Sequence, residues 1–209
     1  MVSQSPFDQY VKEYEQWFSD HAHVYQAELR AVRELLPPTG SGVEIGVGSG
    51  RFAAPLGIPL GVEPSRQMAV HAKERGIQII HGVAEHLPFT EASFDFVLMV
   101  TTICFVADID KALREAHRIL SPNGVCLLGF VDRHSRLGQT YLQRQGESLF
   151  YRDAIFYSTD EVLAHLTQAG FHDFSCRQTI FSGLAETTEE EPVLAGYGQG
   201  SFVVVQGRR

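Results

Sequence analysis

Apolar residues recur at helical spacing through the first part of the chain. They follow one another at intervals of mostly three, four or seven residues, at Phe7, Tyr10, Val11, Tyr14, Phe18, Tyr25, Leu29, Val32 and Leu36. This spacing places the apolar side chains on one face of a helix, and the pair Pro37–Pro38 cannot continue a helix. We therefore expect two helices before the first strand.

Short apolar runs then alternate with stretches of helical spacing. The pattern predicts strands over residues 42–46, 60–63, 78–81, 94–101 and 124–131. Two stretches of helical spacing, 65–75 and 108–120, lie among them. Strands alternating with helices are typical of βαβ units, in which the strands run parallel and are covered on both faces.

The last third of the chain follows a different pattern. Residues 159–169 predict a helix with Thr159 as its N-cap and Gly170 as its end. Strands are expected over 172–181 and 201–206, and the connection between them is polar and rich in turn residues rather than helical. These two strands should pair antiparallel at the edge of the sheet. The expected fold is α/β and doubly wound, with a mostly parallel seven-stranded sheet and an antiparallel last strand.

Composition narrows the classes of protein that fit. The 209 residues are 44% hydrophobic and 20% charged, which suits one globular domain, and the formal net charge of −8 disfavours a nucleic-acid partner. No apolar run is long enough for a membrane span, and the first residues lack the features of a signal peptide, so a cytoplasmic protein is expected. Three scattered cysteines and a lone His21–His23 pair do not indicate a metal site.

A glycine-rich loop ends the first predicted strand. Residues 44–50 read EIGVGSG, and the second strand ends at Glu63, whose carboxylate could accept hydrogen bonds from both ribose hydroxyls of an adenosine. The GxGxxG fingerprint of dinucleotide-binding proteins requires a glycine where this chain has Arg51. An adenosine cofactor without a pyrophosphate is therefore favoured, and a nicotinamide-dependent oxidoreductase is the less favoured alternative.

Five blocks in order along the chain carry a resemblance to a known family. They are residues 44–50 (EIGVGSG), 61–65 (GVEPS), 82–89 (GVAEHLPF), 94–97 (FDFV) and 113–124 (LREAHRILSPNG). These blocks resemble the class I S-adenosylmethionine-dependent methyltransferases of Rossmann-like fold. Within that family they are most similar to the small-molecule group that includes the ubiquinone and menaquinone biosynthesis methyltransferases. The resemblance implies a single methyltransferase domain over residues 1–209, with an N-terminal helical lid over 1–38 and a Rossmann-like core over 41–209.

The resemblance also implies which residues bind the cofactor. Gly46, Val47 and Gly48 would line its methionine part, and Glu63 would hold the ribose. Pro64 and Met68 would flank the adenine, while Ala84 and Glu85 would meet its edge. Thr101 and Thr102 would lie beneath the sulfonium. The remaining expected cofactor-binding residues are Glu44 and Gly50 of the glycine-rich loop and Tyr14 of the lid.

The methyl acceptor is expected to be a small molecule. Methyl transfer is an in-line displacement at an activated carbon, so a catalytic base is optional. Asp132 and His134, just after the fifth strand, are the candidate bases, with loop capping or surface exposure as the alternative. The aromatic first helix would close over the ligands or simply pack on the core, and residues 150–157 would wall the acceptor pocket. A binding module without catalytic activity is the third functional alternative.

Overall fold

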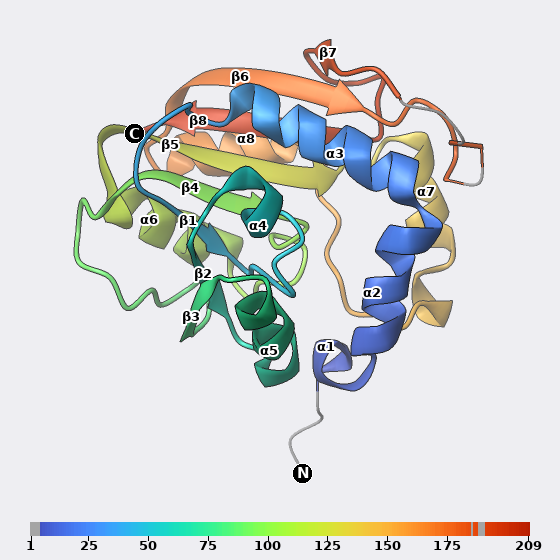
Figure 1. The fold of residues 1–209 in the computed structure, drawn as a ribbon. Coiled ribbons are helices and arrows are strands. Elements are labelled where there is room, and N and C mark those ends of the chain that lie inside the picture. The colour runs from blue at the N-terminus through green and yellow to red at the C-terminus, as the bar shows by residue number, and fades with distance from the viewer. Residues whose placement is uncertain (1–4, 185, 188–190) are drawn as a thin grey trace.

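The computed structural model describes residues 5–184, 186–187 and 191–209. The first four residues of the expected lid therefore lie outside the described residues. A single mixed sheet crosses the molecule, and helices cover both of its faces (Figure 1). This is the doubly wound α/β architecture that the alternating pattern predicted.

The sheet has the strand order β3-β2-β1-β4-β5-β8-β6-β7. The strands are β1 (Gly42–Ile45), β2 (Leu60–Glu63), β3 (Gln78–His81), β4 (Phe94–Val100), β5 (Leu120–Val131), β6 (His172–Thr179), β7 (Leu194–Ala195) and β8 (Phe202–Arg208). The first five strands pair parallel with one another. β8 lies antiparallel between β5 and β6, so the predicted antiparallel pair is confirmed.

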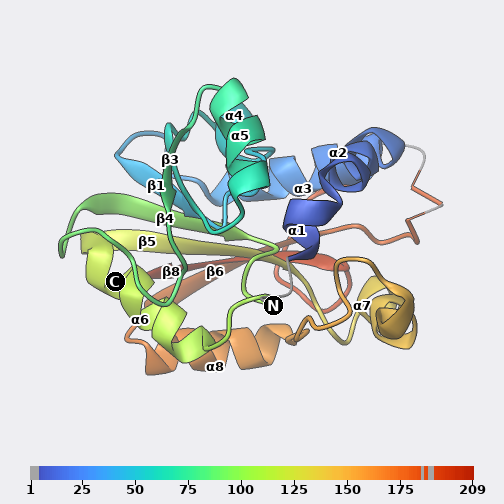
Figure 2. The ribbon, with the colours of Figure 1, turned by 90° about the horizontal axis from the view of Figure 1, so that it is seen from below.

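Helices lie on both faces of this sheet. They are α1 (Pro6–Gln9), α2 (Val11–Asp20), α3 (Ala22–Leu35), α4 (Ala53–Leu56), α5 (Arg66–Glu74), α6 (Ile109–Ile119), α7 (Arg136–Gln143) and α8 (Thr159–Gln168), with a short 3₁₀ helix η1 (Gln145–Glu147). Seen from below, α3, α4 and α5 cover one face while α6 and α8 cover the other (Figure 2). No helix in the described part of the chain is both long and apolar enough to span a membrane.

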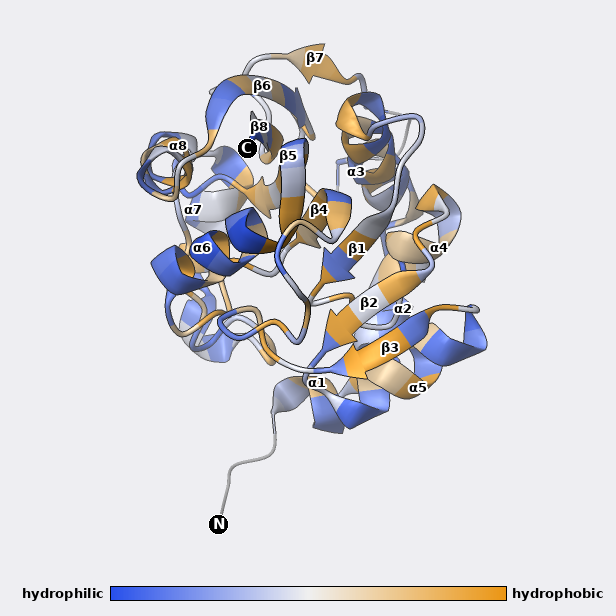
Figure 3. Cartoon of the chain, turned by 90° about the vertical axis from the view of Figure 1, so that its left-hand side faces the viewer, coloured by the Kyte–Doolittle hydropathy of each residue, from blue (hydrophilic) through white to orange (hydrophobic). Residues whose placement is uncertain are grey.

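Each face of the sheet has its own hydrophobic core. One core joins β-strand residues such as Val97 and Met99 to Leu113 of α6 and Leu166 of α8. The other joins the alternate strand residues, for example Leu98, to helices α2 and α3. Figure 3 shows hydrophobic colour along much of β2 and β3 and hydrophilic colour along most of α6. Successive strand side chains point to opposite faces, so a strand buried on both sides contributes to both cores.

The structure differs from the expectations in a few boundaries. Three N-terminal helices replace the expected two, because the chain leaves helical geometry at Tyr10 and again at His21. The two-residue strand β7 makes the sheet eight-stranded rather than seven-stranded. The N-cap of α8 is Ser158 rather than Thr159, since the Ser158 hydroxyl accepts from the Glu161 N–H and the Glu161 carboxylate accepts from the Ser158 N–H. This reciprocal capping box is the preferred way to begin a helix.

Candidate active site

One large cavity lies where the parallel strands end. It has a volume of about 740 Å³ and opens at the carboxyl ends of β1, β2 and β4, with β1 adjacent to β4 where the strand order reverses. Open α/β sheets bind their ligands at this topological switch point. Among the residues expected to bind cofactor, those on the cavity wall are Tyr14, Glu44, Gly46, Val47, Gly48, Glu63, Pro64, Met68, Ala84, Glu85, Thr101 and Thr102.

The glycine-rich loop forms the floor of the cavity with backbone rather than side chains. Gly46 and Gly48 have φ of 68° and 56°, a region that residues with a Cβ seldom adopt. A Cβ at Gly46 would lie 2.5 Å from Thr102 Cγ2, and one at Gly48 would lie 3.1 Å from the Tyr14 hydroxyl. Gly50 also has a positive φ, but it does not line the cavity. Its missing Cβ makes room for Ile77, so Gly50 contributes to the packing of the loop and not to the cavity wall.

Glu63 ends β2 with its carboxylate fixed by the backbone. Its two oxygens accept hydrogen bonds from the N–H groups of Gly48 and Ser65, each at 2.8 Å. Burial raises the pKa of Glu63, while these two bonds and His81 lower it. A carboxylate oxygen can accept two hydrogen bonds, so each oxygen keeps capacity for a further donor. A vicinal diol such as a ribose offers two such donors.

Glu44 and Tyr14 add a second polar group to the same wall. Glu44 is 2% exposed, and its Oε2 has no hydrogen-bond partner among the described residues. Burial, together with the nearby Glu63, raises the pKa of Glu44 well above its ordinary value. Burial, Glu44 and Glu63 likewise raise the pKa of the Tyr14 hydroxyl. The unsatisfied Glu44 oxygen beside a cradle of glycines fits a polar ligand with donor groups.

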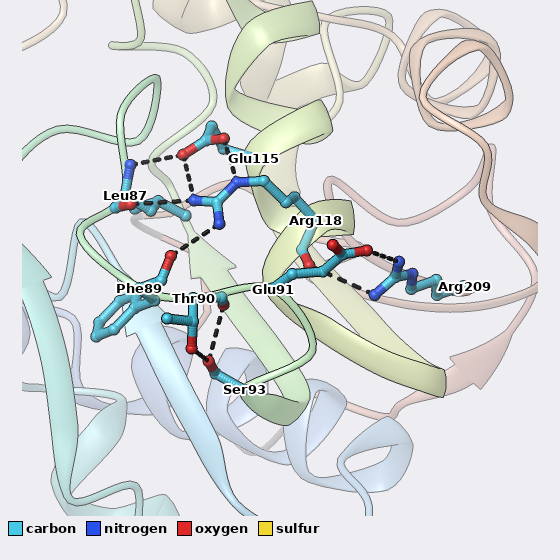
Figure 4. A network of polar contacts seen from close by, with 8 residues as sticks. All are labelled: Leu87, Phe89, Thr90, Glu91, Ser93, Glu115, Arg118 and Arg209. Carbon is cyan, nitrogen blue, oxygen red and sulfur yellow. Dashed lines mark hydrogen bonds and ion pairs between the residues drawn. The ribbon is translucent and has the colours of Figure 1, made fainter.

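The loop between β3 and β4 carries Ala84 and Glu85 to the cavity. Arg118 of α6 donates to the carbonyls of Phe89 at 2.7 Å and Leu87 at 3.1 Å, and it pairs with Glu115, which accepts from the Leu87 N–H (Figure 4). The α6 helix therefore anchors this loop. Glu85 Oε1 accepts from the Ala107 N–H at 2.6 Å, so this side chain also braces the start of α6.

The end of β4 is strained. Thr101 has φ of 51°, which is unfavourable for a β-branched residue, and its N–H donates to the Gly129 carbonyl at 2.7 Å. Thr102 donates its hydroxyl to the carbonyls of Val100 and Ile45. These contacts join the ends of β4, β5 and β1 directly below the cavity. Backbone strain of this kind persists where contacts with the surrounding structure hold the residue in place, and such residues are common at binding sites.

Aromatic side chains close the other side of the cavity. Phe7 of α1 stacks on Phe150 with 5.4 Å between ring centroids, and it meets Phe105 edge-on at 5.0 Å. Phe105 in turn stacks on Tyr151 at 5.7 Å. The aromatic N-terminal helices thus form part of the cavity wall in addition to packing on the core, and the expected aromatic segment 150–157 contributes Phe150 and Tyr151 to that wall.

Neither Asp132 nor His134 lines the cavity, although the preceding Val131 does. The Asp132 carboxylate accepts from the N–H of His134 at 2.7 Å and from both the N–H and the hydroxyl of Thr159, at 2.7 and 2.6 Å. The bonds to Thr159 use both acceptor positions of Oδ2 and join the end of β5 to the start of α8. This placement favours loop capping over the role of a catalytic base, which stays an untested prediction for either residue.

Several residues of the wall were not anticipated from the sequence. They include Glu28 of α3 and Tyr141 of α7, together with Arg51, whose guanidinium pairs with Glu15. A signal for Glu28 exists, because it occupies the apolar stripe of its helix beside Ala27 and Ala31. The signal for Tyr141 is absent, since α7 reaches the cavity only through the fold of the chain.

Comparison with known proteins agrees with this geometry. Residues 43–128 match the methyltransferase domain family. A solved structure of an S-adenosylmethionine-dependent methyltransferase from Thermotoga maritima is 51% identical, with a TM-score of 0.95 over 97% of this chain and 98% of that one. The chain belongs to the class I S-adenosylmethionine-dependent methyltransferases. It is an enzyme whose cofactor is S-adenosylmethionine, which excludes the nicotinamide-dependent and non-catalytic alternatives.

Two further relatives of this methyltransferase show how far the similarity extends. An uncharacterised protein of Methanocaldococcus jannaschii is 40% identical over 97% of this chain and 98% of its own length. A ubiquinone biosynthesis O-methyltransferase of Azorhizobium caulinodans is 28% identical over 73% of this chain and 67% of its own. The similarity to the first relative includes the N-terminal helices as well as the sheet.

The cavity of this methyltransferase fits the cofactor. The glycine cradle and the two carboxylates at the ends of β1 and β2 suit a positively charged nucleoside that brings hydroxyl and ammonium donors. When bound, S-adenosylmethionine supplies a methyl group already activated on sulfonium sulfur. The residues that surround it then need to orient the acceptor and exclude water.

Proposed function

We propose that this methyltransferase transfers the methyl group to a small-molecule acceptor held beside the cofactor. The observation that carries the proposal is the cavity, whose volume of about 740 Å³ lies within the roughly 300–1,000 Å³ typical of sites for small organic ligands. Aromatic contacts between α1 and the segments at Phe105 and Phe150 cover this cavity. Such a cover leaves little room for a macromolecular acceptor.

The charge of the protein and the description of a relative support the same proposal. A net charge of −8 disfavours binding of DNA or RNA, which usually requires a basic surface. The Thermotoga maritima protein is described as a possible histamine N-methyltransferase, and histamine is a small molecule.

The proposed cofactor site follows the cavity wall. Glu63 would accept both ribose hydroxyls, the loop at Gly46–Val47–Gly48 would lie along the methionine part, and Met68 with Ala84 would contact the adenine. The helices α1 and α2 would act as a lid on one domain that spans the chain. Opening and closing of that lid would admit the ligands and exclude water during transfer.

Methyl transfer from labelled S-adenosylmethionine tests the acceptor class. The purified protein is offered a panel of small amines, phenols, carboxylic acids and thiols, and separately bulk RNA, DNA and unfolded protein. Label in small molecules alone supports the proposal, and label only in a macromolecule contradicts it.

The Glu63→Ala variant should bind S-adenosylhomocysteine at least about tenfold more weakly, because hydrogen bonds to a charged group contribute about 1.5–3 kcal/mol each. The exposed Glu74→Ala change on α5 is the control, and unchanged affinity in a folded Glu63→Ala variant would refute the ribose assignment.

A further inference from the structure

A buried acid lies in the cavity wall on the side of the N-terminal helices. Glu28 occupies the apolar stripe of α3, whose neighbouring members Val24, Ala27, Ala31 and Val32 are fully buried. The Glu28 residue is itself only 7% exposed. It nevertheless lines the cavity.

Glu28 has no polar partner among the residues that the structure describes. Across residues 5–184, 186–187 and 191–209, no hydrogen bond or ion pair engages its carboxylate. Burial alone raises the pKa of Glu28 from 4.5 to about 8. Because burying an unpaired acid destabilises a protein, an acid retained at such a position calls for a ligand that satisfies it.

Glu28 stands apart from the acids assigned to the cofactor. Glu63 helps to raise the pKa of Glu44, whereas neither of them affects the pKa of Glu28. The titratable groups near Glu28 are phenols: its charge helps to raise the pKa values of Tyr25, Tyr141 and Tyr151, after the larger effect of burial on each. The described surroundings of Glu28 therefore supply no cation to neutralise it.

The aromatic rings that share the cavity wall with Glu28 also suit a positively charged ligand. Tyr141 and Tyr151 stack with 5.0 Å between their centroids, and both line the cavity. Ring faces attract cations, and this attraction strengthens where water is excluded. A carboxylic acid together with aromatic walls is a favourable environment for an organic ammonium group, and an unfavourable one for an anion.

Resting on the proposed function above, we propose that Glu28 binds a basic amine of the methyl acceptor and accepts the proton that this amine loses before methyl transfer. Glu28 is then the acceptor-recognising residue, and the substrate class is a small amine. An alcohol or thiol acceptor would bring no positive charge to satisfy the carboxylate.

The proposed reaction balances without any further reactant. The acceptor enters as an ammonium ion, R–NH₃⁺, and its charge displaces the proton of the Glu28 acid to water; one N–H proton then passes to the resulting carboxylate. The nitrogen lone pair then forms the N–C bond while the S–C bond breaks, with that electron pair left on sulfur. The methylated ammonium product leaves, and Glu28 remains as the neutral acid with which the cycle began. Glu28 can hold this proton near neutral pH because burial keeps its pKa high.

Binding of matched amines and alcohols to the S-adenosylhomocysteine complex tests the proposal without requiring turnover. The probes are 2-phenylethylamine with 2-phenylethanol and butylamine with butanol, titrated calorimetrically into the wild type, Glu28→Gln and Glu34→Gln. Glu34 lies on the exposed side of the same helix and serves as the matched control. We expect at least one amine to bind the wild type and the control about tenfold more tightly than its alcohol, and Glu28→Gln to abolish that preference. No preference in the wild type, or its survival in Glu28→Gln, overturns the proposal.

Turnover of the tightest-binding amine provides a second readout that a purely structural role would not change. In Glu28→Gln, kcat should fall by about 100-fold, a typical contribution of a positioned base, while the KM for S-adenosylmethionine stays unchanged. An unchanged kcat overturns the proton-transfer step. Methyl transfer confined to alcohols, thiols or acids overturns the Glu28 proposal and leaves the small-molecule function standing. Transfer to no small molecule contradicts the proposed function. In that case the amine-binding result still decides the role of Glu28.

Discussion

At the scale of single residues, two buried glutamates in one cavity have opposite environments. Backbone N–H groups of Gly48 and Ser65 hold the Glu63 carboxylate in place before any ligand arrives. Within the described part of the chain Glu28 receives no such bonds, and burial alone raises its pKa. The first arrangement pre-organises a carboxylate as a hydrogen-bond acceptor, and the second leaves an acid that is stabilised only by a bound partner.

The raised pKa of Glu28 predicts how stability depends on pH. Between pH 4.5 and about 8 the unfolded chain loses the Glu28 proton while the folded protein keeps it, so unfolding becomes easier as pH rises. Glu28→Gln removes this penalty, and its free energy of unfolding should exceed that of the wild type by an amount that grows by up to about 1.4 kcal/mol per pH unit. Urea unfolding of both proteins from pH 5 to 8 measures the difference. Glu34→Gln should show no such trend, and parallel curves for Glu28→Gln and wild type would contradict the prediction.

At the scale of elements, the site depends on where strands and loops end. The strands β1, β2 and β4 finish at one edge of the sheet and deliver the glycine loop, Glu63 and Thr101 to one cavity. The loop that carries Ala84 lies between β3 and β4 and is not part of a strand. Hydrogen bonds from Arg118 and to Glu115 of α6 hold it in place (Figure 4). Helix α6 therefore serves the cavity through this loop as well as covering the sheet.

Removing the anchor of that loop should affect stability and cofactor binding together. Arg118→Met deletes the donors to the carbonyls of Leu87 and Phe89 and breaks the pair with Glu115. We expect a loss of about 1–3 kcal/mol in the free energy of unfolding, and weaker binding of S-adenosylhomocysteine because Ala84 loses its support. Thermal unfolding and calorimetry measure the two effects. The exposed Arg114→Met change on the same helix is the control, and equal behaviour of the two variants would show that Arg118 does not anchor the loop.

At the scale of the whole molecule, ion pairs hold the N-terminal helices over the cavity. Glu15 of α2 pairs with Arg51, which follows the glycine loop, and with Arg75 at 2.6 Å, just after α5. Asp8 of α1 accepts from the Ser65 hydroxyl at 2.7 Å at the start of α5. The cover of the cavity is therefore attached to the elements that form its floor.

Weakening this attachment should change how fast the cofactor leaves. Glu15→Gln removes the charge from both pairs, and we expect S-adenosylhomocysteine to dissociate up to about tenfold faster, with a smaller change in its association rate. Stopped-flow displacement measures the rates, and Asp20→Asn at the exposed end of α2, away from the cavity wall, is the control. An unchanged dissociation rate in Glu15→Gln would show that the lid does not limit release.

Much of this methyltransferase could be predicted from its sequence because the relevant signals are local. The alternation of apolar runs with helical spacing predicted seven of the eight strands and the antiparallel pairing of β6 with β8. The residues 44–50 and Glu63 indicated the cofactor, since glycines at a strand end and an acid at the next strand end meet at one edge of a parallel sheet. Short features gave weaker signals: β7 has two residues, and the breaks at Tyr10 and His21 contain no proline or glycine.

Only the tertiary structure decided which side chains surround the ligands. Asp132 follows a strand end, as a catalytic group would, but its oxygens accept hydrogen bonds from His134 and Thr159, and the latter lies far along the chain. Glu28 lies on the apolar stripe of α3 in the sequence, but only the packing of α3 places it in the cavity wall. Local sequence determines where a strand or helix forms and which residues end it. The partners of a buried polar group come from distant segments, so only the packed fold determines whether that group is satisfied within the protein or remains available to a ligand.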